Sequence, residues 1–304
     1  MVLGHESAGV VTKVGEGVTS LKVGDRVAIE PGRACQACDR CFEGRYNLCP
    51  EMKFSASLLQ GPNDGSLRRY VCFPHYLCHR IPDSMSFEEG ALMEPLSVAV
   101  HSVDRTPVRE GSRVLVLGSG PIGLLVAATA FAKGAKECFL LDINPSRLTF
   151  AKTYLPQVQT IQLPIAEEVQ DDMLDWAQLQ VTQLKLDLAM IDVAFECTGV
   201  NACIALAMYA VRRGGVVMLI GLGKGRTVMP TDLITTREID VRGNFRYANA
   251  YKKSIELVHQ KKISLQGLVS HRFRLEDAVD AYETARTGGS GVLKIQIIGS
   301  EMDS

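Results

Sequence analysis

The sequence predicts an α/β protein in which a doubly wound parallel sheet is joined to a smaller, β-rich domain. Between residues 114 and 221, short apolar runs alternate with longer helical patterns, which is typical of parallel β–α–β units. The first hundred residues instead hold short runs broken by frequent glycines, which favours a small barrel or sandwich. A chain of 304 residues exceeds the roughly 250–300 residues at which a single core stops growing, so we expect two domains.

The composition excludes several classes of protein. The chain is 46% hydrophobic and 22% charged with a net charge of −1, so no basic surface for nucleic acid or an anionic membrane is expected. It has no run of about 18 apolar residues to span a bilayer, and its first residues lack the basic and apolar regions of a signal peptide. Nine cysteines, an odd number, indicate thiols and metal ligands in a reducing compartment, so we expect a cytoplasmic protein.

The β-rich region opens with two strand-like runs, Ala8–Gly15 and Val23–Glu30, each of which contains a glycine turn. A third run at Arg69–Phe73 has the same character. His75 and His79 flank an apolar stretch, and we leave them unassigned because a lone histidine is more often a surface or core residue than a ligand.

Four cysteines follow one another with the spacing C-x2-C-x2-C-x7-C in a polar loop. Four thiolates can close a tetrahedral zinc site that leaves no position for substrate, so we predict a structural zinc site. The alternative, a chance cluster of buried thiols, is disfavoured by spacings this short. The predicted ligands are Cys35, Cys38, Cys41 and Cys49, whereas the cysteines expected singly in the core are Cys72, Cys78, Cys138, Cys197 and Cys203.

A helix is predicted to begin at Ser86, because Glu89 three residues later completes a capping box. This helix carries Glu94 among apolar residues, directly before Pro95. A buried, unpaired carboxylate is costly, so Glu94 needs a metal, a cation or its own protonation. Alternatively it lies on a solvated face, and the spacing leaves both interpretations open.

The central stretch has the pattern of a dinucleotide site. A strand-like run ends in a G-x-G-x-x-G turn at residues 118–123, an Ala/Leu-rich helix follows, and a second run ends at Asp142. Gly118 allows the tight turn, Gly120 lets backbone approach a pyrophosphate, and Gly123 permits close helix–strand packing. The helix N-terminus offers N–H groups to the phosphates. Asp142 is placed to accept hydrogen bonds from a ribose and to repel a 2′-phosphate, which favours NAD over NADP.

Two more buried runs, at residues 191–197 and 215–221, are separated by a helical pattern at 202–211. Because ligands of parallel sheets lie beyond the carboxyl ends of the strands, we expect Asp142, Thr198 and Gly221-Leu222 to lie along one crevice. Within residues 155–190, the sequence predicts the positions of helices and strands only approximately. The final strand and helices after residue 247 are expected to return to the first domain.

Together these motifs resemble one family, the zinc-containing medium-chain alcohol dehydrogenases, in their polyol branch (sorbitol, xylitol or arabinitol). The resemblance covers nearly the whole chain and rests on Gly4-His5-Glu6, the four cysteines, Glu94-Pro95-Leu96-Ser97, the glycine turn, Glu196-Cys197-Thr198-Gly199 and Phe245-Arg246-Tyr247. It implies a GroES-like catalytic domain at residues 1–105, with its zinc lobe at 35–49. A Rossmann NAD-binding domain would follow at 106–244, and 245–304 would return to the catalytic domain.

The resemblance also implies roles for individual residues. His5, Glu6 and Glu94 would hold a catalytic zinc ion, and Glu94, Arg246 and Tyr247 would contact the substrate. The implied cofactor contacts are Gly118, Gly120, Ile122, Gly123, Asp142, Arg147, Thr198, Ile220, Gly221, Leu222, Phe245 and Arg246.

The implied function is the zinc-dependent oxidation of a polyol secondary alcohol to a ketose, with hydride transfer to NAD. Association into a dimer or tetramer is also implied. The family has a cysteine ligand well before the Gly-His-Glu motif, whereas this chain starts three residues before Gly4. We therefore expect the family's N-terminal part to be missing and the catalytic zinc site to be incomplete. The second hypothesis is accordingly a truncated, inactive relative that keeps NAD and structural zinc binding.

Overall fold

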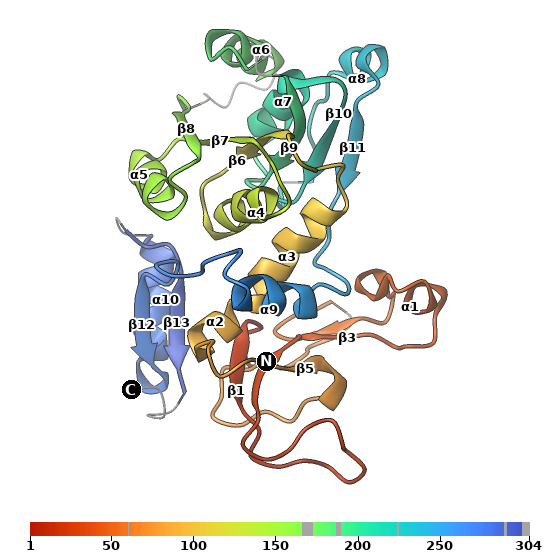
Figure 1. The fold of residues 1–304 in the computed structure, drawn as a ribbon, viewed down its shortest axis with the longest axis vertical. Helices are drawn as coiled ribbons and strands as arrows, with labels where there is room; N and C mark the ends of the chain where they lie inside the picture. Colours follow the sequence, from red (N-terminus) through yellow and green to blue (C-terminus); the bar gives the residue numbers. More distant parts are fainter. Residues whose placement is uncertain (60, 166–172, 187–189, 224, 289–290, 300–304) are drawn as a thin grey trace. The chain divides into compact units, whose positions relative to one another are not determined.

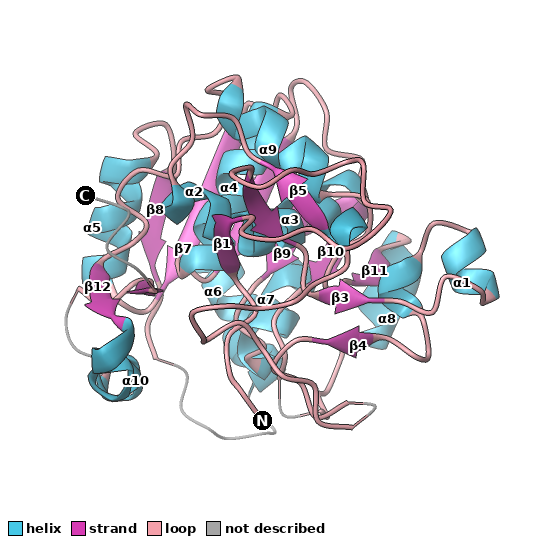
Figure 2. Ribbon diagram, turned by 90° about the horizontal axis from the view of Figure 1, so that it is seen from below, coloured by secondary structure: helices cyan, strands magenta, loops and turns pink. Residues whose placement is uncertain are grey.

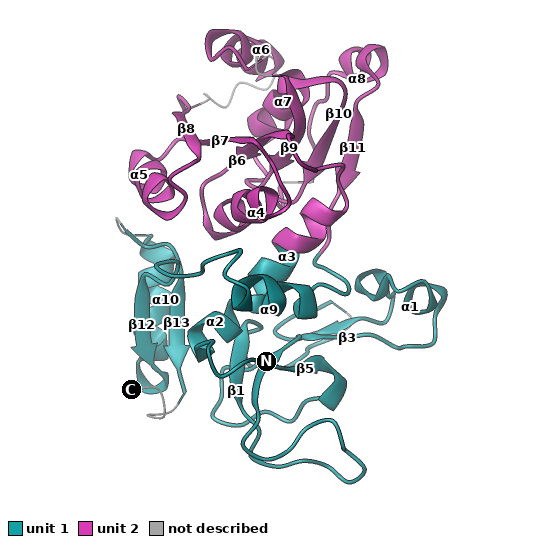
Figure 3. Ribbon diagram, viewed as in Figure 1, with its two compact units in different colours: residues 1–98, 246–304 teal, residues 99–245 magenta. Residues whose placement is uncertain are grey.

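The structure is a computed structural model that describes residues 1–59, 61–165, 173–186, 190–223, 225–288 and 291–299. The chain forms two compact units (Figure 3). Unit 1 comprises residues 1–98 and 246–304, and unit 2 comprises residues 99–245. No helix within these described ranges has the length and apolar character needed to cross a bilayer.

Unit 2 is built on a six-stranded sheet in the order β11-β10-β9-β6-β7-β8 (Figure 1). Every neighbouring pair is parallel. Counted along the chain, this is the order 3-2-1-4-5-6 of a doubly wound dinucleotide-binding sheet, so the predicted fold class is confirmed. The strands are β6 (Arg113–Leu117), β7 (Glu137–Asp142), β8 (Gln159–Gln162), β9 (Ile191–Glu196), β10 (Val211–Leu219) and β11 (Asp240–Gly243).

Helices connect these strands and cover their apolar side chains. They are α4 (Pro121–Ala132), α5 (Pro145–Tyr154), α6 (Met173–Gln183), α7 (Asn201–Ala210) and α8 (Thr231–Arg237). The central strands have continuous apolar sequences, as expected where helices cover both faces of the sheet. Leu115, Leu117 and Phe195 are completely buried. Leu115 and Leu117 share one core with Ala177 of α6 and Ala205 of α7.

Unit 1 contains a three-stranded antiparallel sheet in the order β1-β2-β5. A separate antiparallel pair, β3 and β4, lies side by side in Figure 2, and β12 pairs with β13 in parallel. The strands are β1 (Ser7–Val10), β2 (Arg26–Ile29), β3 (Gly32–Arg33), β4 (Lys53–Phe54), β5 (Cys78–Arg80), β12 (His271–Arg274) and β13 (Ile295–Ile298).

The helices of unit 1 are short. They are α1 (Asp39–Phe42), α2 (Phe87–Ala91), α9 (Tyr251–His259) and α10 (Ala278–Thr287), with 3₁₀ turns η1 (Tyr46–Leu48), η2 (His75–Leu77) and η3 (Leu275–Asp277). Helix α3 (Met93–Asp104) begins in unit 1 and continues into unit 2. The predicted capping box is confirmed: the Ser86 side chain accepts from the Glu89 N–H, and the Glu89 carboxylate accepts from the Ser86 N–H.

Four details predicted from the sequence are wrong. The helix that Ser86 caps ends at Ala91, and Glu94 belongs to the separate helix α3, because a turn at Leu92 interrupts the helical run. Residues 69–73 form no strand: the aromatic and β-branched residues there meet no pairing strand in the described structure, and Tyr70 is 74% exposed. Cys72 in the same segment is exposed for the same reason, and is not a core residue. The first strand, β1, ends at Val10 and does not reach Gly15, because its partner β2 begins only at Arg26.

Candidate functional site

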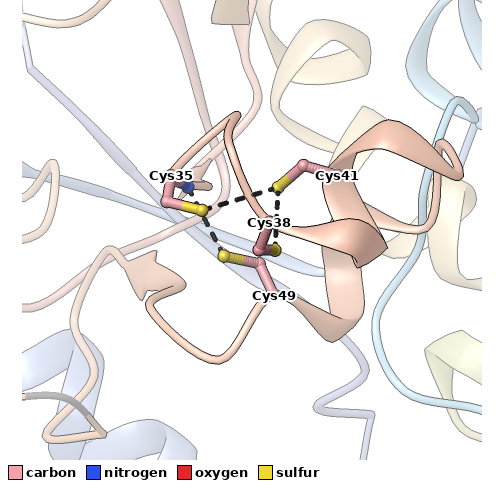
Figure 4. Close-up of side chains that lie close together, drawn as sticks. All are labelled: Cys35, Cys38, Cys41 and Cys49. Atoms are coloured by element: carbon pink, nitrogen blue, oxygen red, sulfur yellow. Dashed lines mark hydrogen bonds between the residues drawn. The ribbon is translucent and has the colours of Figure 1, made fainter.

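The four predicted cysteines of unit 1 converge on one point (Figure 4). Cys38 precedes α1, Cys41 lies within it, and Cys49 follows η1, so two short helical turns and the β3–β4 pair bring the thiols together. The Cys35–Cys41 and Cys38–Cys41 sulfur distances are 3.9 Å and 3.6 Å. Four sulfurs at 2.3 Å from a tetrahedral zinc ion would be about 3.8 Å apart. The lobe therefore has the shape of a closed four-thiolate site.

Hydrogen bonding within the four-cysteine lobe favours the thiolate form of Cys35. The Ala37 N–H donates to the Cys35 sulfur and lowers the pKa of that thiol to about 7. The Cys35 N–H in turn donates to the Cys49 sulfur at 3.4 Å. Burial raises the pKa of Cys41 to about 12, so a metal ion has to displace that proton on binding.

A second group of possible ligands forms where His5 and Glu6 enter β1 and Glu94 lies in the first turn of α3. Their ligand atoms all lie within 4.8 Å of one another. Glu94 is 6% exposed, which settles the question left open by its sequence: the carboxyl group is buried, not solvated. Burial, with the nearby Glu6 charge, raises the pKa of Glu94 to about 8, and burial lowers the pKa of His5.

This group needs a cation, because it holds two carboxyl groups side by side in a partly buried place. The Lys294 ammonium next to β13 contacts the Glu6 carboxylate and supplies one positive charge. One imidazole nitrogen and two carboxylate oxygens are also a donor set that zinc accepts in catalytic sites with an open position. The residues present fit a metal ion.

Arg246 and Tyr247, two of the three predicted substrate contacts, adjoin this group in unit 1. The Tyr247 hydroxyl is buried and forms no hydrogen bond of ordinary geometry with a described residue, yet it lies close enough to Glu94 to favour that carboxylate. A buried hydroxyl with free bonding capacity suits a polar ligand. Arg246 adopts a left-handed backbone conformation with φ of +50°, which is uncommon outside glycine.

In unit 2, the glycine turn connects β6 to α4 as the motif requires. Gly118 has φ of +99°, and a Cβ atom on Gly123 would lie 1.8 Å from the Gly118 carbonyl oxygen, so both positions require glycine. Gly120 is the N-cap residue of α4, directly before Pro121. A Cβ atom placed on Gly120 would have no other heavy atom within 4 Å. The helix N-terminus and the space before it can accept a phosphate group.

Asp142 ends β7, and its carboxylate is already held by three hydrogen bonds. The Ser119 N–H and hydroxyl both donate to Oδ2 at 2.7 Å, and the Asn144 N–H donates to Oδ1 at 2.9 Å. With about four lone-pair positions, the carboxylate retains one for a ligand hydroxyl. Sequence reasoning missed Ser119; a hydroxyl residue inside the glycine turn was the available signal.

The predicted contacts at β9 and β10 lie beyond the carboxyl ends of these strands. The buried Glu196 carboxylate accepts from the Thr198 and Gly199 N–H groups at 2.8 and 2.9 Å and from the Thr198 hydroxyl, which organises that loop. A Cβ atom on Gly221 would lie 2.1 Å from the Gly199 nitrogen, so the two loops touch backbone to backbone. Of the other predicted contacts, Ile122 and Ile220 are half-buried, whereas Arg147, Leu222 and Phe245 are exposed.

A parallel sheet with this glycine turn, together with donor sets suited to zinc, defines the class of nucleotide-dependent zinc dehydrogenases. Comparison with known proteins gives the family. The alcohol dehydrogenase GroES-like domain matches residues 1–83, and the zinc-binding dehydrogenase domain matches residues 121–260. The chain belongs to the zinc-containing medium-chain alcohol dehydrogenases, so the resemblance inferred from the motifs is confirmed.

Named relatives are similar over almost the whole chain. An L-arabinitol 4-dehydrogenase of Talaromyces emersonii is 47% identical over 99% of this chain and 77% of its own length. A sorbitol dehydrogenase of Gallus gallus is 46% identical over 95% of this chain and 78% of its own. The crystal structure of L-idonate 5-dehydrogenase from Escherichia coli superposes with a TM-score of 0.86 at 27% identity, covering 98% of this chain and 82% of that one.

Proposed function

We propose that this protein oxidises a secondary alcohol of a polyol to a ketose and transfers the hydride to NAD. The observation that carries this proposal is the group formed by His5, Glu6 and Glu94 next to the buried Tyr247 hydroxyl, a metal-ligand set beside a hydrogen-bonding group. The names of the relatives, arabinitol, sorbitol and idonate dehydrogenases, support a polyhydroxylated substrate.

His5, Glu6 and Glu94 would hold the catalytic zinc ion, and the four cysteines the structural one. Zinc supplies Lewis-acid polarisation of the substrate hydroxyl when bound. The chain's own groups select the substrate: the Tyr247 hydroxyl and the Arg246 guanidinium donate hydrogen bonds to neighbouring polyol hydroxyls. The burial of Tyr247 and the partial burial of Arg246 reduce competition from water and strengthen such bonds.

The choice of NAD over NADP is supported by Asp142. Its carboxylate is held in place by Ser119 and Asn144, and the residue is 8% exposed. The remaining acceptor position suits a ribose hydroxyl, whereas a 2′-phosphate would bring two negative charges against it.

The proposed physiological form is a cytoplasmic homo-oligomer that engages neither nucleic acid nor membranes. The near-neutral charge supports the absence of polyanionic partners. Strand β11 lies at one edge of the six-stranded sheet, and an edge strand can pair with a strand of a second copy. Light scattering at micromolar concentration checks this; a monomer would contradict it.

The test of the proposed function is zinc per chain measured together with NAD reduction by sorbitol, xylitol and L-arabinitol. Two zinc ions per chain with turnover support the proposal. Glu94→Gln is expected to lower the zinc content to one per chain and abolish turnover, whereas Glu88→Gln, outside the ligand group, is expected to keep both. One zinc per chain without turnover in the unmodified protein would contradict the proposal and support the inactive relative instead.

A further inference from the structure

Phe54 lies against two groups of the candidate site, although no sequence motif singled it out. Its ring is buried, at the end of β4. The guanidinium carbon of Arg246 lies 3.6 Å above the ring centroid, and the His5 ring packs against the same phenyl group at 5.5 Å with a tilt of 56°. One aromatic side chain thus touches both a predicted substrate contact and a predicted metal ligand.

The ring itself is tightly held. Phe54 pairs with Gly32 across the β3–β4 ladder. A Cβ atom on Gly32 would lie 3.4 Å from Phe54 Cδ2 and 3.1 Å from the Met52 sulfur, so the absence of a side chain at Gly32 leaves the space that the ring occupies. Strand β3 precedes Cys35 and β4 follows Cys49, so the strand pair closes the base of the four-cysteine lobe.

The contact with the Phe54 ring restricts the Arg246 side chain. An arginine side chain has many rotamers, and fixing it costs conformational entropy. Its left-handed backbone conformation shows that the surrounding structure imposes the position. The face of an aromatic ring attracts a guanidinium group, more strongly where water is excluded, and this contact involves the face of the guanidinium and not its edge N–H groups.

We propose that Phe54 is a positioning residue for substrate binding: its ring holds the Arg246 guanidinium in place before a polyol binds, and His5 and Gly32 hold the ring. Ordering Arg246 in advance removes an entropy cost from substrate binding. Loss of the ring therefore weakens polyol binding and leaves the metal sites intact. The inference rests on the proposed function for the identity of the ligand, but the contact itself is testable without turnover.

The kinetic test compares Phe54→Leu, which removes the ring, with Phe54→Tyr, which keeps it. Phe54→Leu is expected to raise KM for the polyol by about 3- to 30-fold, the range of a cation–π contact, with a smaller change in kcat. Phe54→Tyr is expected to stay close to the unmodified protein. In an Arg246→Ala background, Phe54→Leu is expected to leave KM unchanged, because no guanidinium remains to be held. Additive effects of the two substitutions would overturn the inference.

The matched control is Phe87→Leu. The Arg26 guanidinium carbon lies 4.3 Å above the Phe87 ring, so this pair has the same chemistry in the same unit, away from the ligand group. Phe87→Leu is expected to lower Tm without altering the polyol KM. Zinc per chain is expected to be unchanged in Phe54→Leu; a lower zinc content would show that the ring acts through His5 and would overturn the inference.

A readout without catalysis separates this inference from the proposed function. In ¹⁵N-arginine-labelled protein, the Arg246 side-chain N–H signal is expected to be shifted upfield by the Phe54 ring, and the shift is expected to vanish in Phe54→Leu and persist in Phe54→Tyr. An unshifted Arg246 signal would overturn the inference even in an active enzyme. A shifted signal in a protein that oxidises no polyol would leave the contact established and overturn the proposed function alone.

Discussion

Among the individual residues, Asp142 is the one that we expect to determine the choice between NAD and NADP. Its carboxylate has three donors from its own chain and one remaining acceptor position, so we expect it to discriminate between nucleotides by charge and by a single hydrogen bond. Ser119 and Asn144 hold this carboxylate in one orientation by hydrogen bonds from their own groups. We therefore expect removal of the Asp142 charge to affect selectivity between NADH and NADPH more than it affects folding.

Asp142→Asn is expected to weaken NADH binding by about 10- to 100-fold, the range for one hydrogen bond to a charged group. NADPH binding is expected to change little or to strengthen, because the repulsion of its 2′-phosphate is lost. Fluorescence titration with both nucleotides measures this. Asp240→Asn, at an exposed strand end, is the control; an unchanged NADH to NADPH ratio in Asp142→Asn would contradict the assignment.

Glu196 gives a prediction for the pH dependence of stability. Burial raises the pKa of this carboxyl above its usual 4.5 in the folded protein. A group with a raised folded pKa contributes stability below its unfolded pKa, and that stability is lost as the pH rises through the folded pKa. Glu196→Gln cannot ionise and so does not lose stability in this way. Above about pH 4.5, the unfolding free energy of the variant is therefore expected to rise relative to that of the unmodified protein.

Urea unfolding at a series of pH values measures the effect of Glu196→Gln. The exposed Glu238→Gln is the control for the change of charge. Parallel pH profiles of the unmodified protein and Glu196→Gln would contradict the prediction.

Among the elements, the lobe between β3 and β4 has almost no apolar core of its own. Helix α1 has only four residues and none of them is buried. Isolated helices this short do not persist without support from other contacts. Four thiolates around a metal ion would supply that support, so we expect the local fold of residues 35–49 to depend on metal binding.

Cys41→Ser is expected to remove one zinc ion per chain and to open residues 35–49 to limited proteolysis. The same cleavage is expected in the unmodified protein after treatment with a strong chelator. Cys72→Ser, at an exposed thiol, is expected to change neither zinc content nor cleavage. A Cys41→Ser protein with full zinc content and a resistant lobe would show that these thiols hold no metal.

Helix α2 depends on its capping box. Ser86→Ala removes the acceptor for the Glu89 N–H and is expected to cost about 1 kcal/mol of unfolding free energy. Chemical denaturation measures this cost. Ser146→Ala serves as the control, since Asn144 already caps α5 and the Ser146 side chain is exposed; equal losses in both variants would rule out a role for the cap.

In the whole molecule, each of the two units has its own ligand chemistry. Unit 1 holds both candidate metal groups, and unit 2 holds the candidate nucleotide site. A ligand that binds only the folded state stabilises it by about 2.7 kcal/mol at a hundred times its Kd. Stabilisation by metal and by nucleotide is therefore expected to appear in different parts of the chain.

Hydrogen exchange is expected to separate the two effects. NADH is expected to protect amides at residues 118–123, 142–147 and 196–200, whereas chelation is expected to expose amides at 35–49. Protection by NADH confined to unit 1 would contradict the assignment of the nucleotide site.

The features predicted well from the sequence are those in which residues close in the chain determine the structure. The β6–α4 turn, the four-cysteine lobe and the α2 cap each lie within a few residues of sequence, and glycine, cysteine and serine have conformational or bonding properties that act locally. The strand predicted at residues 69–73 does not form because a strand needs a pairing partner. The side chains of this segment are equally suited to an extended segment on the surface.

The sequence by itself determined the parallel sheet, the glycine turn and the four-thiolate lobe, because local spacing and alternation encode them. Only the tertiary structure decided that Glu94 is buried beside His5 and Glu6, that Ser119 holds Asp142, and that Phe54 lies beneath Arg246. These contacts join segments far apart in the chain. Burial, a shifted pKa and a stacked ring depend on which distant side chains fill the surrounding space, and no local pattern specifies that.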